Sequence, residues 1–257
     1  MTQISLISIT DLLNSLPNGQ SASQVKQAYE FAAEVHNGRQ RDSGELYIEH
    51  DLAVAQTMNQ LGVDTPTLVA SLLHDCLLPH TSVTVETLRK RFGEEPAALI
   101  EGLNHLYDYA AEAQYQRHRD PEVDRQTIEQ VRRAVLSIIE GDIRVILIRM
   151  ADCLQDLRKA SNLPQEQRFI IANEARHIYA PLANRLGIWQ LKWELEDLAF
   201  RYLQPEKYKE IASKLAARRA ERMEQIDDAV QKLQRAIRET GLKGSVSGRS
   251  KHIYSIY

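Results

Sequence analysis

Hydrophobic residues recur every three or four positions along most of this 257-residue chain, which is the spacing of one apolar face on an α-helix. The segment 23–36 carries such a face, and Gly38 follows where a helix commonly ends. The same spacing predicts further helices over residues 50–61, 66–77, 85–92, 96–109, 126–139 and 143–157. The pattern therefore predicts an all-α fold for this part of the chain.

Three changes of pattern suggest how the chain is divided. Residues 110–126 are polar and weakly periodic, which favours a loop able to rearrange over a ligand. A second helical block begins near Pro164, should kink or end at Pro181, and continues as one or two long amphipathic helices over 207–239. After Gly241 apolar and polar residues alternate, which indicates a strand. We expect a helical domain over 1–160, a helical linker over 161–240 and the start of a strand-containing domain over 241–257.

The composition of the chain indicates the size of its core, its cellular location and its net charge. With 43% hydrophobic and 26% charged residues, the chain can bury a sizeable core. No apolar run approaches the ~20 residues that span a bilayer, and the N-terminus lacks the features of a secretion signal, so a cytoplasmic protein is expected. A net charge of −3 gives no reason to expect direct DNA binding. Cys76 and Cys153 are expected as small buried residues rather than as a disulfide.

Four residues could form a metal site: His50, His74, Asp75 and Asp152. Asp152 lies in an apolar helical segment, where an unpaired buried carboxylate is very costly. A metal ion would stabilise it, and two imidazoles with two carboxylates suit manganese, iron or zinc better than calcium. The alternative is that the first three are unrelated polar residues at helix ends and that Asp152 pairs with Arg149 or Arg158.

The chain contains, in this order, the motifs "GELYIEH", "SLLHD", "FGEEPAALIEGL", "DIRVILIRMADCLQDLR", "IYAPLANRLGIWQLKWELEDLAFRYLQPEKY" and "GRSKHIYSIY". Together they resemble the N-terminal half of the RelA/SpoT homologue family of stringent-response alarmone enzymes. The resemblance implies an all-α HD-domain helical bundle that removes the 3′-diphosphate of guanosine tetra- or pentaphosphate with a manganese ion. Linker helices and the first strand of a truncated α/β synthetase domain should follow. In the family, that domain transfers pyrophosphate from ATP to GTP or GDP, and further domains, expected outside this chain, contact the ribosome.

The resemblance also suggests roles for individual residues. The four residues of the candidate metal site fall on the metal positions of the family. Arg41 and Ser43 fall where the family binds the guanine nucleotide, although their loop composition alone favours surface residues. Arg249 and Lys251 would lie near the ATP phosphates or base in the synthetase domain. Because the acidic metal-binding residues of that domain are absent, this chain alone is not expected to synthesise alarmone.

The sequence departs from the family beside the metal positions. Active family hydrolases carry a Glu-Asp pair within one turn of the HD pair, whereas this chain reads "HDCLLPHT". Leu78 and Pro79 can neither accept a proton nor bind a water through their side chains. His80 is either a substitute base or an exposed loop residue. Asp42 and Asp156 stand where the family commonly has a basic residue and an asparagine, and the added negative charge opposes binding of a polyphosphate.

These departures favour an HD domain that has lost hydrolysis, keeps a metal pocket and regulates the neighbouring synthetase through the helices between residues 164 and 239. The competing hypothesis is an active manganese-dependent hydrolase that recruits His80 or another carboxylate. A general HD phosphohydrolase acting on nucleotides fits poorly with the later synthetase motifs.

Overall fold

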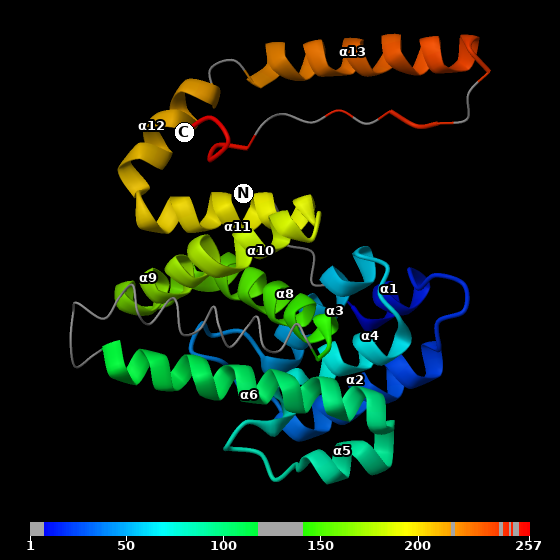
Figure 1. Cartoon of the computed structure of the whole chain (residues 1–257), viewed down its shortest axis with the longest axis vertical. Coiled ribbons are helices and arrows are strands. Elements are labelled where there is room, and N and C mark those ends of the chain that lie inside the picture. Colours follow the sequence, from blue (N-terminus) through cyan, green and yellow to red (C-terminus); the bar gives the residue numbers. More distant parts are fainter. Residues whose placement is uncertain (1–7, 118–140, 217–218, 242–243, 247, 249–251) are drawn as a thin grey trace.

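The computed structural model describes residues 8–117, 141–216, 219–241, 244–246, 248 and 252–257. These residues are predominantly helical and contain no strand, which confirms the all-α prediction for them. The helices are α1 (Ile9–Asn14), α2 (Ala22–His36), α3 (Tyr47–Gln60), α4 (Thr65–Leu73), α5 (Val85–Phe92), α6 (Glu94–Arg117), α8 (Ile143–Lys159), α9 (Gln165–Glu174), α10 (Ala180–Arg185), α11 (Trp189–Leu203), α12 (Pro205–Ala216) and α13 (Arg219–Glu239) (Figure 1).

Two hydrophobic cores meet at α8. The first core lies among α2, α3, α4 and α6, and the second lies beneath α9, α10 and α11. Val145, Ile148 and Ala151 of α8 belong to the first core, whereas Ile146 and Met150 belong to the second. Consecutive residues of one helix point in different directions, so an apolar helix can serve two cores at once. Polar side chains on α8 are therefore carried into the middle of the molecule.

The helix ends follow local chemistry. The side chain of Asp64 accepts a hydrogen bond of 3.0 Å from the backbone N–H of Thr67, and Pro66 occupies the first turn of α4. The helix α4 ends at Leu73, and a 3₁₀ turn over His74–Leu77 follows. This turn tightens the backbone at the predicted HD pair, where the sequence pattern suggested that the helix continues.

Three features differ from the sequence expectations in detail. Pro181 does mark a break, which takes the form of a π-helical turn over Ala175–Tyr179 before α10 begins. The predicted loop over 110–126 is wrong in its first part, because α6 continues to Arg117. Its alanine, glutamate and glutamine residues are good helix formers although they lack apolar periodicity. The predicted helix over 126–139 lies outside the described residues.

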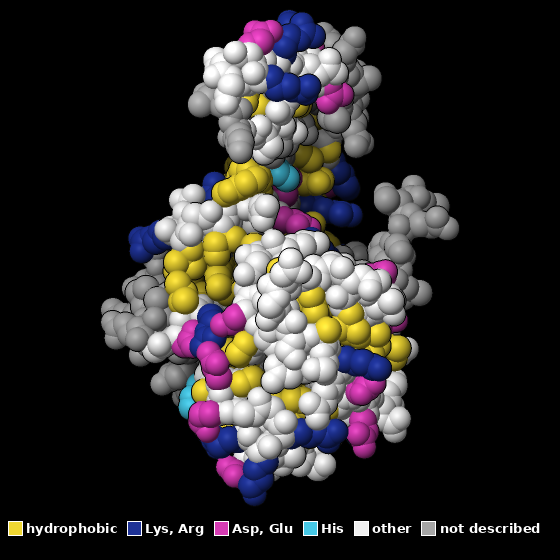
Figure 2. Space-filling model, turned by 90° about the vertical axis from the view of Figure 1, so that its right-hand side faces the viewer, with side chains coloured by type: hydrophobic (Ala, Val, Ile, Leu, Met, Phe, Trp, Pro, Cys, Tyr) yellow, Lys and Arg dark blue, Asp and Glu magenta, His cyan; other side chains and the backbone are white. Residues whose placement is uncertain are grey.

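The last region folds back on the linker helices. After α13 the chain returns beside it, and the side chain of Gln234 bonds to the carbonyl of Gly244 and the N–H of Val246, at 3.3 and 3.0 Å (Figure 1). The described residues there form no strand, so the predicted strand is not observed; a lone strand has no partner for its backbone groups. In the space-filling view, a narrow neck showing hydrophobic side chains joins the larger lower body to the smaller upper part (Figure 2).

None of the helices in the described ranges combines the length and apolar character needed to cross a bilayer. Cys76 and Cys153 are both free and buried, as expected.

Candidate metal centre and nucleotide pocket

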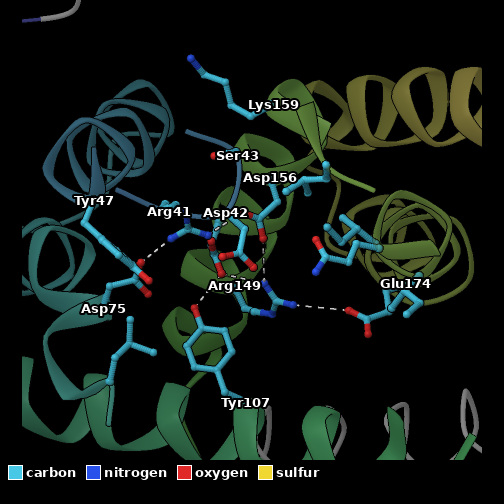
Figure 3. A pocket seen from close by; sticks show the side chains of 16 residues that line it. Arg41, Asp42, Ser43, Tyr47, Asp75, Tyr107, Arg149, Asp156, Lys159 and Glu174 are labelled. Atoms are coloured by element: carbon cyan, nitrogen blue, oxygen red, sulfur yellow. Dashed lines mark hydrogen bonds and ion pairs between the residues drawn. The ribbon is translucent and has the colours of Figure 1, made fainter. Parts of the chain in front are cut away.

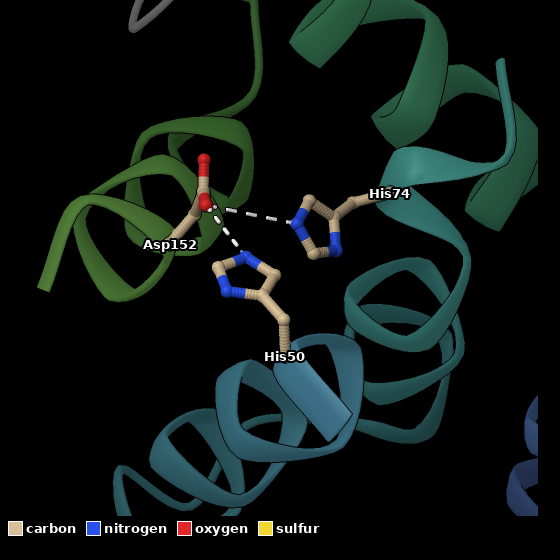
Figure 4. A group of neighbouring side chains, drawn as sticks. All are labelled: His50, His74 and Asp152. Carbon is tan, nitrogen blue, oxygen red and sulfur yellow. Dashed lines mark hydrogen bonds and ion pairs between the residues drawn. The ribbon is translucent and has the colours of Figure 1, made fainter. Parts of the chain in front are cut away.

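Three of the predicted metal residues converge from segments far apart in the sequence. His50 projects from α3, His74 opens the 3₁₀ turn after α4, and Asp152 lies within α8 (Figure 4). The Oδ1 atom of Asp152 lies 2.9 Å from His50 Nε2 and 3.7 Å from His74 Nε2. One ligand atom from each of the three residues lies within 4.8 Å of the other two, and all three residues are buried. This arrangement can surround a single ion.

The fourth predicted residue, Asp75, lies beside this group. Its Oδ1 atom is 3.6 Å from His74 Nε2. Its Oδ2 atom accepts a hydrogen bond from the guanidinium of Arg41. Burial would raise the pKa of Asp75, but His74 and Arg41 lower it below its ordinary value, so the carboxylate is ionised at neutral pH. The structure therefore places the predicted ligands together, with one of them already held by an arginine.

The orientation of His74 is set by the backbone. Its Nδ1 atom lies 2.8 Å from the carbonyl oxygen of Ser71. A carbonyl only accepts, so Nδ1 carries the hydrogen. The opposite nitrogen, Nε2, is buried and has no hydrogen-bond partner among the described residues. A buried nitrogen without a partner, aimed at two carboxylates, fits a metal ligand.

Asp51 forms a second layer that sequence reasoning missed. It is fully buried, and its carboxylate lies 3.3 Å from Nδ1 of His74 and 3.2 Å from Nε2 of His36. The ring of His36 stacks on Tyr47, with centroids 4.9 Å apart. The sequence contains a feature that could have identified Asp51, because His50 and Asp51 form an adjacent His-Asp pair like that of residues 74–75.

Asp152 has partners besides the imidazoles. Its Oδ2 atom accepts hydrogen bonds of 2.6 Å from both Arg149 Nη1 and the hydroxyl of Tyr107. The pairing with Arg149 that was considered from the sequence is present together with the convergence of the histidines, whereas Arg158 pairs with Glu194. Burial would raise the pKa of Asp152, but Arg149 and the histidines hold it well below its ordinary value. The carboxylate therefore remains charged.

Both imidazoles take up protons readily in this setting. Burial alone would lower the pKa of His50, but its hydrogen bonds to Asp152 and Glu45 raise it to about 9. Burial would also lower the pKa of His74, but Asp75 and the carboxylates beside it raise that pKa to about 10. Protons and a metal ion therefore compete for the same nitrogen atoms.

A pocket of about 460 Å³ opens beside this group (Figure 3). Its cationic lining residues are Arg41, Arg149 and Lys159. Its acidic lining residues are Asp42, Asp75, Asp152, Asp156 and Glu174. Ser43 and Tyr47 also line it, and Leu78 is part of its apolar lining. The predicted nucleotide residues thus share a pocket with two of the predicted metal residues.

His80 does not join this pocket. Its side chain is exposed, it is not among the residues that line the pocket, and its ring centroid lies 5.3 Å from that of Tyr47. This position agrees with the exposed-loop alternative and disfavours His80 as a base. Arg249 and Lys251 lie outside the described residues.

Comparisons with known proteins identify the family. A family model described as HD domain matches residues 28–189. A GTP pyrophosphokinase of Myxococcus xanthus is 40% identical over 233 residues, which are 91% of this chain and 30% of that protein. The bifunctional (p)ppGpp synthase/hydrolase SpoT of Escherichia coli is 36% identical over 250 residues, 97% of this chain and 34% of that protein. The chain spans about a third of the length of these curated relatives.

A solved structure shares the fold. It is a metazoan orthologue of SpoT, described as hydrolysing ppGpp and acting in starvation responses, with a TM-score of 0.50 and 22% identity. The match covers 72% of this chain and 97% of that one. This likeness concerns the fold. The sequence relatives, which are named as enzymes of (p)ppGpp metabolism, confirm the resemblance to the RelA/SpoT family. The chain belongs to the HD domain family.

Proposed function

We propose that this chain is the part of a (p)ppGpp-metabolising enzyme that carries a metal-binding HD domain with little or no hydrolytic activity. Its role is to bind metal and guanine nucleotide and to influence a neighbouring synthetase domain. The observation that carries the proposal is the lining of the pocket, where Leu78 lies beside Asp75. A hydrolase needs a group that positions the attacking water and takes its proton, and a leucine side chain does neither.

The other carboxylates of the pocket are poor substitutes. Asp75 and Asp156 both accept hydrogen bonds from Arg41. Arg149 contacts Asp152 and Glu174, at 2.6 and 3.4 Å. Four of the five lining carboxylates are therefore ion-paired. The pKa values of Asp75 and Asp152 lie below the ordinary value, so these two carboxylates are less available to take a proton from water.

The metal part of the proposal rests on the donor set. His50, His74, Asp75 and Asp152 would hold the ion, since they supply two imidazole nitrogens and two carboxylates. This mixed set suits manganese, iron or zinc, and we name manganese because the RelA/SpoT resemblance implies it. A bound divalent cation would lower the pKa of a water and offset phosphate charge. The residues of the chain orient the site, since Ser71 fixes His74 and Tyr107 holds Asp152.

The regulatory part rests on the connection from α8 to the end of the chain. The helix α11 packs against α8, which carries Asp152, and against α9. The carboxylate of Asp197 on α11 accepts a 2.7 Å hydrogen bond from the N–H of Tyr254 and lies 3.2 Å from Nδ1 of His252. A structural change at one site can reach another site through a series of rigid helices that pack against one another. We infer that α11 is the element through which the HD domain acts on the region after residue 241.

A second candidate function is an active manganese-dependent hydrolase. Asp156 favours it, because burial and the nearby Asp152 raise the pKa of this pocket carboxylate, which suits a general base. In that case Asp156→Asn should abolish turnover. Under the proposed function there is almost no turnover to lose.

The test of the proposed function is calorimetry with manganese and then with guanosine tetraphosphate. Wild type should bind both. Asp152→Ala should lose the manganese signal, whereas Asp42→Asn, at an exposed carboxylate, should keep it. Equal manganese signals in wild type and Asp152→Ala would remove the metal from the proposal. Failure of guanosine tetraphosphate to bind the manganese-loaded wild type would remove the nucleotide.

A further inference from the structure

Arg41 bridges two carboxylates that belong to different elements. Its Nη1 donates to Oδ2 of Asp75, in the 3₁₀ turn after α4, and its Nη2 donates to Oδ1 of Asp156 on α8, 2.7 Å away (Figure 3). The side chains of Arg41 and Asp156 are each 19% exposed, and that of Asp75 is 7% exposed. Charge pairs so shielded from solvent are stronger than surface pairs.

The loop that carries Arg41 is held in place by its own backbone. The N–H of Arg41 donates to the carbonyl of Glu45 at 2.8 Å, and the N–H of Gly44 donates to the carbonyl of Arg41 at 2.9 Å. Gly44 has a φ of 85°, a conformation that glycine adopts without strain. The amide of Asn162 donates to the carbonyl of Ser43 at 3.1 Å, which ties the loop to the segment after α8. The guanidinium is therefore preorganised between its two carboxylates.

Each of the three cationic side chains that line the pocket in the described structure forms an ion pair with a carboxylate. Arg149 is engaged by Asp152 and Glu174, at 2.6 and 3.4 Å, and lies 4.0 Å from Oδ2 of Asp156. Lys159 lies 3.4 Å from Oε2 of Glu45. A polyphosphate needs guanidinium or ammonium groups whose donors are available. Arg41 donates to Asp75, which is a candidate metal ligand, and to Asp156, which stands where the family commonly has an uncharged asparagine.

We propose that Arg41, Asp75 and Asp156 form a clasp that links metal binding to nucleotide binding. The guanidinium competes with a divalent cation for Asp75, and Asp156 competes with the phosphates of the nucleotide for the guanidinium. A metal ion on Asp75 releases one edge of Arg41, which then binds a phosphate oxygen, so each ligand strengthens the binding of the other. Asp156 is thus a specificity-determining residue that weakens polyphosphate binding. This inference rests on the proposed function for the identity of the two ligands.

The metal arm of the test compares two variants that remove one positive charge from the pocket. Arg41→Gln frees Asp75 and should tighten manganese binding by on the order of tenfold, measured by calorimetry without nucleotide. Lys159→Gln removes a lining cation that does not contact Asp75 and should change manganese affinity less than about threefold. Arg41→Lys keeps the charge but lacks the two-edged donor geometry, so it should lie between wild type and Arg41→Gln. Melting curves establish that each variant is folded.

The nucleotide arm compares two variants that each remove one negative charge. With manganese present, Asp156→Asn should bind guanosine tetraphosphate on the order of tenfold more tightly, because Arg41 is released. Asp42→Asn should tighten binding less than about threefold, because its carboxylate is exposed, whereas the guanidinium of Arg41 donates to Asp75 and Asp156. In an Arg41→Gln background, most of the effect of Asp156→Asn should be lost, and only the small part that comes from the 4.0 Å contact between Asp156 and Arg149 should remain.

The two arms separate the clasp from the proposed function. Equal effects of Arg41→Gln and Lys159→Gln on manganese, or a full effect of Asp156→Asn without Arg41, would overturn the clasp. If no variant binds guanosine tetraphosphate but Arg41→Gln still tightens manganese selectively, the nucleotide part of the proposed function fails and the competition at Asp75 stands. If neither wild type nor any variant binds manganese, both the metal site and the clasp are wrong.

Discussion

The Nε2 atom of His50 lies 2.9 Å from Oδ1 of Asp152, although the two residues are separated by 102 positions. A second polar contact joins their helices about one turn after Asp152. There the side-chain amide of Gln155 donates to Thr57 Oγ1 at 2.8 Å and to the carbonyl of Ala53 at 3.1 Å. This polar contact fixes α8 against α3 beside the candidate metal centre. The two proposed ligands are thus positioned by helix packing and by a specific hydrogen-bonded side chain.

The first prediction concerns pH. The pKa values of His50 and His74 are raised to about 9 and about 10 without metal, so both must lose a proton on binding an ion. Manganese affinity should therefore rise between pH 7 and pH 9, by up to roughly tenfold per pH unit for each proton released. Calorimetry in buffers of different ionisation enthalpy measures the protons released. An affinity that is constant over this range would contradict the assignment of these imidazoles.

The same pKa values predict how the stability of the metal-free protein, kept so by a chelator, changes with pH. A histidine with a raised pKa stabilises the fold fully below its ordinary value of 6.5, and this contribution is lost as pH rises through about 9 to 10. Stability to urea should therefore fall over this window with chelator present, and saturating manganese should oppose the fall because the ion binds the deprotonated imidazoles.

The second prediction concerns Asp51. Asp51→Ala removes the buried partner of His36 and His74 and should lower the free energy of unfolding by roughly 3 kcal/mol or more. Manganese affinity should fall by about 10- to 100-fold, because the ring of His74 loses support. The control is Asp42→Ala, an exposed site where a change within about 0.5 kcal/mol is expected. Equal urea midpoints for the two variants would refute a structural role for Asp51.

The third prediction concerns the missing Glu-Asp pair. Leu78→Glu with Pro79→Asp returns carboxylates to the turn after Asp75, and the first of these two positions lines the pocket. This double variant should gain measurable hydrolysis of guanosine tetraphosphate, but less than a fully active enzyme, since a misplacement of ~1 Å costs on the order of 10²-fold. Pro79→Ala is the matched control, because it relaxes the turn without adding a carboxylate. A folded double variant that binds both ligands and stays inactive would place the defect elsewhere in the pocket.

The fourth prediction concerns the link between α11 and the C-terminal residues. Asp197→Ala removes the acceptor for the N–H groups of Ile253 and Tyr254. Hydrogen exchange over residues 252–257 should accelerate, whereas exchange in α8 should not change. The conservative Asp197→Asn keeps an acceptor oxygen and should show a smaller effect. Unchanged exchange over 252–257 in Asp197→Ala would remove this contact from the regulatory path.

The sequence predicted the helices and much of the candidate site for understandable reasons. Apolar periodicity reports the buried face of a helix, and the apolar character of 143–157 correctly suggested that α8 is central. His50, His74, Asp75 and Asp152 came from residue chemistry and family resemblance, and the structure brings them together. Their ligand roles remain a proposal.

What the sequence did not show depends on contacts between distant segments. The two partners of Arg41 lie 34 and 115 positions away, and the partner of Tyr107 lies 45 positions away. No periodicity encodes such pairs, because they arise only when the helices pack. The strand expected after residue 241 is not observed among the described residues there, and alternation favours a strand only where another strand is available to pair with it.

The central claim is tested most directly by the release of pyrophosphate from guanosine tetraphosphate by the manganese-loaded wild-type chain. Enzymes typically turn over at about 10 s⁻¹, and loss of a general base costs ~10²–10⁴ in rate. The account predicts release on the order of 10⁻¹ s⁻¹ or slower, from a protein that binds both ligands. Turnover near ~10 s⁻¹, abolished by Asp156→Asn, would contradict it and establish an active hydrolase with Asp156 as the base.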